Sequence, residues 1–513
     1  MNKYIKTILP VAALALTMGM TSCTGDLDVT PIDPNLDLES TPEGLLNKCY
    51  ANFAMQGNQG GNEVDIDGFD GGTVGLVRQM WNSNELTSDE AICGWGDAGI
   101  TEFVTNTYGD QHPMLYGYYS RLTTGITYCN QYIAEKGGHD ATMTAEARFL
   151  RAFQYYLIMD AWGSVPFATE PLATPRQISR EEAYEWILNE VLDLEPALSD
   201  AKAKKSSDKG YGRVDKAAAW MLLARLYLNA EVYTGTAQWA KAAEYAKKVM
   251  DSDYKIHKSG ANQWSAYQML FMADNGETGA AYEGIFPLLQ DGKMSQSWCS
   301  SLFLIGSTYD ADLHANVYDP GATNNTDQAW GGNRCRPTLL QKFGITNDDA
   351  YHVFAWDMTA ITGDDRALFD GVDRLYDNTD PGVFKNGFAT TKFSNWRSDN
   401  GTTNSATFAD MDFFIMRAAE ANLTYAEATA RMNNGTTTAE GKQAIDELRD
   451  RAHAAKKASY SLNDICDEWS REFYFEGRRR VDLIRFGKFG GKKVFPIPSV
   501  VITANGFTQN TGY

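Results

Sequence analysis

The sequence predicts a mainly α-helical protein in which degenerate tetratricopeptide-like helix pairs form a scaffold for a long loop-rich ligand-binding region. Three observations support this fold class. Apolar residues recur every three to four positions in several windows. These windows come in pairs with Ala, Tyr and Trp at packing positions, which resembles tetratricopeptide repeats of irregular period. Between two helical blocks, residues 253–409 are rich in Gly, Asp, Asn and aromatic residues.

The composition narrows the classes of function. The chain has 513 residues, of which 43% are hydrophobic and 22% charged, so it can build a large folded core. It carries 46 Lys and Arg against 66 Asp and Glu, which gives a net charge of −20. Because nucleic-acid binding needs a basic surface, this balance argues against a nucleic-acid partner.

The N-terminal residues 1–22 have the features of a secretory signal. Lys3 and Lys6 supply a short positive region, and residues 8–20 are apolar but too few to span a bilayer, which needs about 20. Small residues and then Cys23 follow, an arrangement that resembles a bacterial lipoprotein signal. We therefore expect cleavage before Cys23, lipidation of its thiol and attachment to a membrane through the lipid. The alternative is plain secretion with Cys23 as an ordinary thiol.

Residues 23–40 are predicted to form a lipidated acidic tether, because they are polar and acidic and contain proline. The folded domain is expected to occupy residues 41–513. The other six cysteines are far apart and include no C-x-x-C pair, which argues against a zinc ribbon or a redox motif. They are expected to be buried, and disulfide pairing among them stays open.

The helical scaffold is predicted in two blocks, residues 41–252 and 410–513. In the first block, residues 144–161 place apolar side chains on one broad face, with Thr144 as N-cap and Gly163 after the last turn. The other predicted helices are 180–197, 215–230 and 237–251 in the first block, and 410–432, 438–455 and 462–486 in the second.

Between these blocks, residues 253–409 are predicted to be a loop-rich insertion with short helices and a few strands. Only short apolar runs occur in it. Long loops on a rigid scaffold commonly carry binding residues. A ligand-binding function is therefore expected to involve this insertion.

Five groups of motifs occur in a fixed order along the chain. They are Leu27-Asp28-Val29-Thr30-Pro31; Ala145–Ala152 with Tyr155-Tyr156, Trp162-Gly163 and Val165-Pro166; Arg417–Glu420 with Ala426–Ala428; Arg471–Phe473 with Phe475–Arg479 and Asp482–Gly487; and Phe495–Pro498 with Gln509-Asn510 and Gly512-Tyr513. In this order, behind a lipoprotein signal, they strongly resemble the SusD/RagB family of Bacteroidetes surface glycan-binding lipoproteins.

The resemblance implies a mostly helical, repeat-supported domain without catalytic activity and without a cofactor. Such proteins lie on the outer-membrane surface, held by their lipid and facing the cell exterior. They capture oligosaccharides or polysaccharides and deliver them to a partner TonB-dependent transporter. For this chain the resemblance points to a starch-like α-glucan. The charges within the motifs, Arg148, Glu420, Arg478 and Asp482, are expected to be paired structural charges rather than catalytic groups.

Glycan binding needs aromatic faces that stack on sugar rings and polar side chains that bond the hydroxyls. Asp70, Arg78 and Trp95 resemble, in type and spacing, a polar pair and an aromatic platform of starch-binding members. The sequence departs from that pattern at Ala98, where an asparagine is expected.

A second aromatic cluster lies within residues 298–336 and includes Trp298, Tyr309 and Tyr318. Trp330 stands between small residues in a Gly-rich loop, so we expect it to be exposed and to form an aromatic arc with Trp95. Tyr309 is the remaining predicted glycan-binding residue. The alternative for each aromatic residue is packing in the core.

Other functions stay open. Residues 65–70 begin like a calcium loop, but Leu76 stands at the twelfth position instead of glutamate, so only a looser Ca²⁺ site is conceivable there. Tetratricopeptide-like helices commonly hold proteins, so a peptide-binding or scaffold lipoprotein of an import complex is the second candidate. A glycoside hydrolase is a distant third, since neighbouring acids such as Asp364 and Asp365 do not face each other across a cleft.

Overall fold

The computed structural model describes residues 41–57, 60–315, 323–347 and 353–513. Within these, residues 45–513 form one compact unit. The predicted signal peptide 1–22, the lipidation site Cys23 and the tether 23–40 lie outside the described residues. In the described part of the chain, no helix has both the length and the apolar character that a bilayer span requires.

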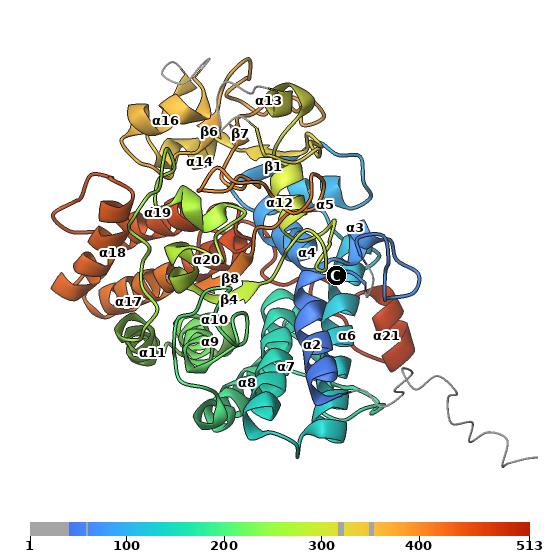
Figure 1. Ribbon diagram of the computed structural model, residues 1–513. Coiled ribbons are helices and arrows are strands. Elements are labelled where there is room, and N and C mark those ends of the chain that lie inside the picture. The colour runs from blue at the N-terminus through green and yellow to red at the C-terminus, as the bar shows by residue number, and fades with distance from the viewer. Residues whose placement is uncertain (1–40, 58–59, 316–322, 348–352) are drawn as a thin grey trace, which may run out of the picture. The chain divides into compact units, whose positions relative to one another are not determined.

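The scaffold is a series of helices in which each packs against the next (Figure 1). The series runs α6 (Pro113–Lys136), α7 (Ala141–Trp162), α8 (Arg180–Leu194), α9 (Lys216–Leu228), α11 (Trp239–Asp251) and α17 (Ala418–Met432), and α17 also packs on α18 (Ala439–Arg451) and α19 (Leu462–Phe473). The packing of α11 on α17 joins segments that are separated by the whole loop-rich stretch. The mainly helical, tetratricopeptide-like fold class is confirmed.

Local sequence explains where the helices begin and end. The N-cap of α7 is Asp140, whose side chain accepts a hydrogen bond from the Met143 N–H at 2.8 Å, and not the predicted Thr144, which lies inside the helix. Gly163 follows the last turn of α7 with a φ of 75°, a positive value that glycine adopts without steric penalty. Ser179 and Glu182 form a complete capping box at the start of α8.

Two predicted helices of the second block are wrong in part. The predicted helix 410–432 begins only at Ala418, because Phe413–Arg417 is the fully buried strand β8. This strand pairs antiparallel with β4 (Gly284–Leu288). The predicted helix 462–486 is broken between α19 and α20 (Arg479–Arg485), where Phe475 and Gly477 have φ values of 63° and 75°.

Two long helices of the first block were not predicted. They are α2 (Pro42–Ala54) and α6, and hydrogen bonds from Asn52 of α2 to Arg121 O and Gln154 Oε1 join them to α7. Gly125 in α6 explains why the pattern is weak. A Cβ there would lie 1.7 Å from Gln154 Oε1, so glycine permits the close packing of α6 on α7 at the expense of helix propensity.

Elements between residues 253 and 409 are short in the described part of the chain. The longest helix there is α16 (Ala355–Thr362), and the others are α12 (Ser301–Gly306), α13 (Ala311–Ala315) and α14 (Pro337–Lys342). The strands form two-stranded sheets. Further elements of the chain are α3 (Gly71–Val74), α4 (Leu76–Trp81), α5 (Ile100–Thr105), α10 (Ala230–Thr234), α21 (Ser499–Asn505), the π-helical η1 (Asn82–Leu86), the 3₁₀ turns η2 (Glu195–Ala197), η3 (Gln268–Phe271) and η4 (Gly279–Glu283), and strands β1 (Ala91–Cys93), β2 (Val165–Phe167), β3 (Arg176–Ile178), β5 (Asn333–Cys335), β6 (Phe369–Asp370) and β7 (Ala389–Thr390).

The N-terminal and C-terminal parts of the compact unit interlock. The buried indole of Trp81 donates a hydrogen bond to Phe475 O at 2.9 Å. The buried Glu85 carboxylate accepts the backbone N–H of Arg478 at 2.9 Å. The segment that follows α3 is therefore held in place by hydrogen bonds to residues almost four hundred positions later in the chain.

A buried ion network lies beneath the β4–β8 ribbon. The guanidinium of Arg417, at the end of β8, contacts the carboxylates of Glu283, Glu472 and Glu476. All four side chains are buried. Buried carboxylates need a cationic or hydrogen-bonding partner for each oxygen. The guanidinium of Arg451 is a second partner of both Glu283 and Glu472.

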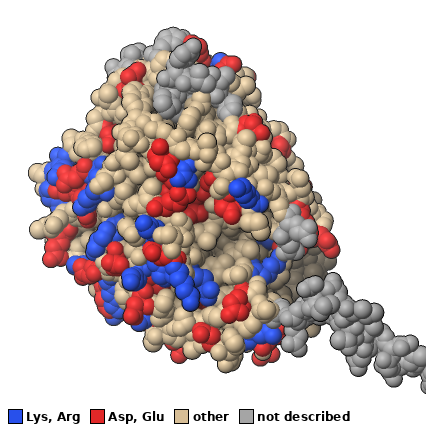
Figure 2. Space-filling view, viewed as in Figure 1, with Lys and Arg blue, Asp and Glu red and all other residues tan. Residues whose placement is uncertain are grey.

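The charges predicted to be structural are paired, as expected. Arg148 binds Glu190 through two hydrogen bonds of 2.9 and 2.7 Å. Glu420 contacts Arg225 and Arg478, and Arg478 also contacts Asp482. On the face that Figure 2 shows, basic side chains lie beside acidic ones rather than in one continuous basic surface.

The six cysteines of the described residues are all buried and unpaired: Cys49, Cys93, Cys129, Cys299, Cys335 and Cys466. This agrees with the prediction that they serve as small hydrophobic residues. Burial also raises the pKa of the Cys93 thiol to about 12, which keeps it protonated and unreactive at neutral pH.

Candidate ligand-binding site

Pairing of β1 with β5 brings the two predicted aromatic segments together. Cys93 faces Asn333 in this antiparallel ladder, and the Gly94 N–H donates to Gly332 O at 3.3 Å. Trp95 leaves β1 at the end where Trp330 approaches β5. Both indoles consequently line one open pocket with a volume of about 560 Å³. Asp70 and Arg78 line the same pocket, so four of the five predicted residues meet there.

Three indoles form the aromatic wall. The ring centroids of Trp95 and Trp330 are 6.3 Å apart, and Trp298 lies 6.3 Å from Trp330 on its other side. The indole N–H of Trp95 donates to Trp330 O, and that of Trp330 donates to Gln328 Oε1 at 2.9 Å. All three rings are half-buried. Their hydrogen bonds hold the rings in place while part of each surface stays in contact with solvent.

Arg78 provides the charged wall of the pocket. Its guanidinium lies 5.3 Å from the ring centroid of Trp95 and contacts Asp97 at 2.7 Å. The Asp97 side chain is half exposed, and the Arg78 side chain is mostly buried. A cation–π contact and an ion pair therefore fix the guanidinium beside the aromatic wall, where it can donate to a ligand hydroxyl.

Asp70 lies on the exposed rim and caps α3. Its Oδ1 accepts the Thr73 N–H at 3.0 Å, and its Oδ2 accepts the Thr73 hydroxyl at 2.7 Å. Each oxygen keeps a further lone pair for a ligand. Asp65, the first residue of the possible calcium loop, is instead paired with Lys48 and Arg121. In the described chain, no group of three His, Cys, Asp or Glu side chains is placed to hold a metal ion, at residues 65–70 or elsewhere.

Glycines bring the backbone against the aromatic wall. A Cβ on Gly332 would lie 2.1 Å from Cε2 of Trp95, and one on Gly306 would lie 3.1 Å from Trp330. Neither glycine has a positive φ, so both are required by close contact and not by backbone conformation. The positions of Trp95 and Trp330 therefore depend on the absence of side chains beneath them.

Tyr309 does not line this pocket, contrary to the prediction that it contacts ligand. Its side chain is fully buried and packs with Leu313 and Ala389. The backbone carbonyl of Tyr309 accepts the Gly331 N–H at 2.7 Å, so this residue supports the Trp330 loop from behind. Tyr318 lies outside the described residues.

Sequence reasoning left three lining residues with polar or aromatic side chains out of the predicted site: Asn62, Asp97 and Trp298. Trp298 had a signal, since it lies in the second aromatic cluster. Its ring lies tilted against Phe408 with the ring centroids 4.8 Å apart, and its indole N–H donates to Asn62 Oδ1 at 3.3 Å. These two partners come from distant segments, so spacing alone could not separate Trp298 from a core residue.

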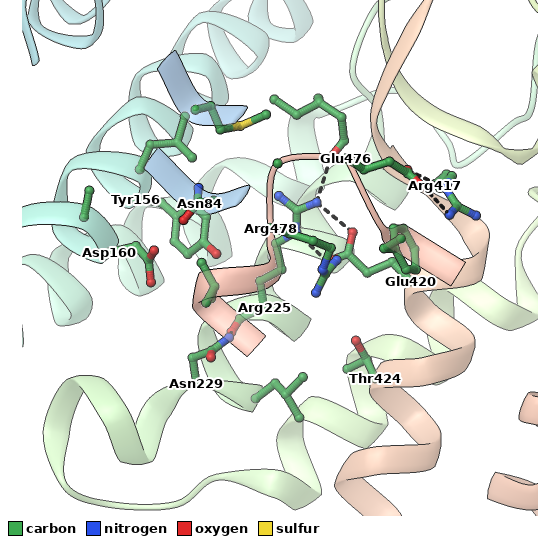
Figure 3. Close-up of a pocket in the computed structure, with 18 of the residues that line it drawn as sticks. Asn84, Tyr156, Asp160, Arg225, Asn229, Arg417, Glu420, Thr424, Glu476 and Arg478 are labelled. Carbon is green, nitrogen blue, oxygen red and sulfur yellow. Dashed lines mark hydrogen bonds and ion pairs between the residues drawn. The ribbon is translucent and has the colours of Figure 1, made fainter. Parts of the chain in front are cut away.

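A second, inner cavity is lined by the structural charges (Figure 3). Arg225, Glu420 and Arg478 point toward one another across it, with Asp160 and Tyr156 on the opposite side. Its volume of about 60 Å³ has room for about two water molecules, and not for a sugar ring or a peptide. The ligand-binding candidate is therefore the open aromatic pocket.

The helical scaffold thus presents an open pocket lined by indole, guanidinium and carboxylate groups. Comparison with known proteins identifies the family. The chain is 34% identical to the starch-binding protein SusD of Bacteroides thetaiotaomicron, over the full length of both proteins. The SusD family profile matches residues 307–513. The chain belongs to the SusD family.

Solved structures share the fold. A laminarin-binding SusD-like protein superposes with a TM-score of 0.65 at 21% identity, covering 93% of this chain and 99% of that one. Surface glycan-binding protein A of Bacteroides thetaiotaomicron, in complex with laminarihexaose, gives a TM-score of 0.65 at 19% identity, covering 91% and 98% of the two chains. A SusD-like protein of Formosa agariphila is 24% identical in sequence over 90% of this chain and 89% of its own.

Proposed function

We propose that this protein is a non-catalytic glycan-binding protein that captures oligosaccharides or polysaccharides in the aromatic pocket. The observation that carries the proposal is the meeting of Trp95, Trp298 and Trp330 with Arg78 in one open pocket. Indole faces stack on the C–H faces of pyranose rings, and guanidinium and carboxylate groups bond the hydroxyls. The pocket is large enough for a short oligosaccharide.

The best candidate ligand is a starch-like α-glucan. The relative at 34% identity over both full lengths is a starch-binding protein, whereas the structures in complex with laminarihexaose and with xylogluco-oligosaccharide are 19% and 20% identical. The α-glucan helix curves, and an arc of tilted rings suits a curved ligand better than a flat one. The interplanar angles of 55° and 43° show that neighbouring indoles are tilted relative to each other rather than coplanar, which is compatible with such an arc.

The wider assembly follows from family membership and the N-terminal signal. We propose that Cys23 carries lipid, that the protein is attached to the outer membrane on the cell exterior, and that it delivers glycan to a TonB-dependent transporter. A binder tethered at a transporter raises the local glycan concentration at its mouth. A strain carrying Cys23→Ala should release the protein from the outer membrane, which fractionation and palmitate labelling measure.

Removing either central indole should weaken glycan binding. We expect Trp95→Ala and Trp330→Ala each to lose about 1–3 kcal/mol of binding free energy, or roughly 5–150-fold in affinity, because a stacking surface is lost. Isothermal titration calorimetry with α-glucan, laminarin and xyloglucan oligosaccharides measures this loss. Trp220→Ala is the matched control, since Trp220 is a half-buried indole on α9 outside the pocket.

A further variant displaces the Trp95 indole without removing it. Gly332→Ala should push the Trp95 indole out of position and reduce affinity about tenfold, or about 1.4 kcal/mol. Gly96→Ala is the control, because Gly96 follows Trp95 in the chain and has open space around its Cβ position. This variant should bind glycan as the unchanged protein does. Equal affinities for both glycine variants would show that the position of Trp95 does not matter for the ligand.

The second candidate is peptide binding, which the tetratricopeptide-like scaffold favours. The same calorimetric experiment tests it. If the folded protein binds extended peptides and none of the three glycans, peptide binding replaces glycan binding as the proposed function. Binding to one glycan class that neither Trp95→Ala nor Trp330→Ala weakens would place the glycan site elsewhere.

A further inference from the structure

A second open pocket, separate from the Trp95–Trp330 pocket in its lining residues, lies beside α16. Its volume is about 460 Å³, within the range of small-ligand sites. One wall is α16, another is the turn at residues 260–268, and His453 after α18 closes a third side. No function discussed so far uses this pocket.

Trp356 presents an exposed indole at this pocket. Its exposed fraction is 46%, although tryptophan is highly buried on average. The buried side chains of Ala355 and Met358 anchor α16 in the core. Trp356 is therefore exposed because it lies on the outer face of a packed helix. An exposed indole on a short, anchored helix offers a flat surface for stacking.

Polar groups around the Trp356 indole are held in place by hydrogen bonds and keep further atoms available to bond a ligand. The exposed His453 imidazole is held through Nδ1 by Asp365 Oδ2 at 2.7 Å, so its Nε2 is free to meet a ligand. Gln268 accepts the Ser265 N–H through Oε1 at 3.0 Å, and its amide nitrogen has no partner in the described chain. The buried indole N–H of Trp264, a further lining residue, also has no hydrogen-bond partner among the described residues.

The charges of the pocket favour a neutral ligand. Its lysine, Lys258, contacts Glu447 at 2.6 Å, and Asp365 contacts His453. Neither sign of charge is in excess, so nothing here would select a phosphate or a carboxylate. A stacking surface combined with imidazole, amide and carboxylate groups matches the alternating apolar faces and hydroxyl edges of a sugar ring.

We infer that this pocket is a second carbohydrate-binding site, which takes one or two rings of a neutral glycan on Trp356 with His453 and Gln268 bonding the hydroxyls. The inference depends on the proposed function only for the class of ligand. Two sites on one protein bind a long polysaccharide more tightly than either site alone, because the second contact is intramolecular.

The first test isolates the second site. The full chain is labelled with fluorinated tryptophan and carries Trp95→Ala with Trp330→Ala, so the principal pocket is disabled. Its Trp356 fluorine resonance, assigned by its loss in Trp356→Phe, should shift on titration with short α-glucan, laminarin or xyloglucan oligosaccharides. A Trp356 resonance that none of the three glycans moves at saturating concentration would overturn the inference.

The second test uses the polymer. In affinity gel electrophoresis through the corresponding polysaccharide, Trp356→Ala should lower the apparent affinity about tenfold or more relative to the unchanged protein. Ile361→Ala is the control, since Ile361 is exposed on the same helix but does not line the pocket. Equal retention of Trp356→Ala and Ile361→Ala would contradict the inference.

The two proposals fail separately. In labelled protein that keeps both Trp95 and Trp330, glycan shifts of the Trp95 resonance without any of the Trp356 resonance would uphold the principal site and reject the second. Shifts at Trp356 in a protein whose Trp95 and Trp330 variants bind unchanged would do the opposite. Thermal melting of each variant checks folding, and the partial exposure of Trp356 makes its replacement tolerable.

Discussion

Replacing Arg417 by methionine should lower the free energy of unfolding by about 3–5 kcal/mol, because it leaves buried carboxylates without their main cation. The guanidinium donates to Glu476 Oε2 at 2.9 Å, to Glu472 Oε1 at 2.6 Å and to Glu283 Oε1 at 3.0 Å. It also lies 3.8 Å from the ring centroid of Phe473. Burial alone would raise the pKa of Glu472, yet Arg451 and Arg417 hold it well below its usual range.

The measurement is urea unfolding followed by circular dichroism, with Arg397→Met as the matched control. Arg397 also contacts two carboxylates, Glu277 and Asp399, but these are half exposed. An exposed arrangement of this kind contributes about 0–1 kcal/mol. If the two arginine variants lose the same free energy, the buried network is not a main source of stability.

Replacing Asp412 by asparagine should stabilise the protein, and more so at higher pH. Burial raises the pKa of Asp412 to about 7, and the nearby Asp291 and Asp410 carboxylates add to the rise. The folded state therefore keeps a proton that the unfolded chain releases near pH 3.8. Stability from this group is highest at low pH and falls as the pH rises toward 7, above which the loss is complete.

The expected gain from Asp412→Asn is about 2–3 kcal/mol larger at pH 8 than at pH 5. Urea unfolding of both proteins at the two pH values, in the presence of a chelator so that no divalent cation binds the acidic side chains, measures this difference. Burial lowers the pKa values of His112 and His257, so these two histidines make the protein less stable as the pH falls, opposite to Asp412. Both proteins contain these histidines, so their effect cancels in the comparison.

Asp399→Asn is the control for pH. Hydrogen bonding from Arg397 lowers the pKa of Asp399 to about 2, so this carboxylate stays ionised across the whole range from pH 5 to pH 8. Its replacement should change stability equally at both pH values. A gain from Asp412→Asn that is the same at pH 5 and pH 8 would show that Asp412 titrates normally in the folded protein.

Much of the scaffold could be predicted because its signals are local. The helix around residues 144–161 has an apolar face and a glycine after its last turn, and both features depend only on neighbouring residues. The strand Phe413–Arg417 could not be distinguished from a helix, since a short buried apolar run has no period of its own. Its partner β4 lies more than one hundred residues earlier.

The site was predictable where a resemblance or a Gly-rich loop pointed to it: the resemblance indicated Trp95, and the loop composition indicated Trp330. The glycines that pack against these two rings, Gly332 and Gly306, are not their sequence neighbours, so this contact could not be predicted. Nothing in the sequence distinguishes Tyr309 from Trp298, although the first is fully buried and the second is half-buried. The lipidation of Cys23 and the domain boundaries at 252–253 and 409–410 stay predictions.

The interlock of Trp81 with Phe475 has a consequence for the order in which the chain folds. A loop of almost four hundred residues must close before that hydrogen bond forms, and closing so long a loop is slow and entropically unfavourable. Arg78, three residues before Trp81, belongs to the aromatic pocket. We therefore expect the Arg78 side of the pocket to form late in folding, after this long loop has closed.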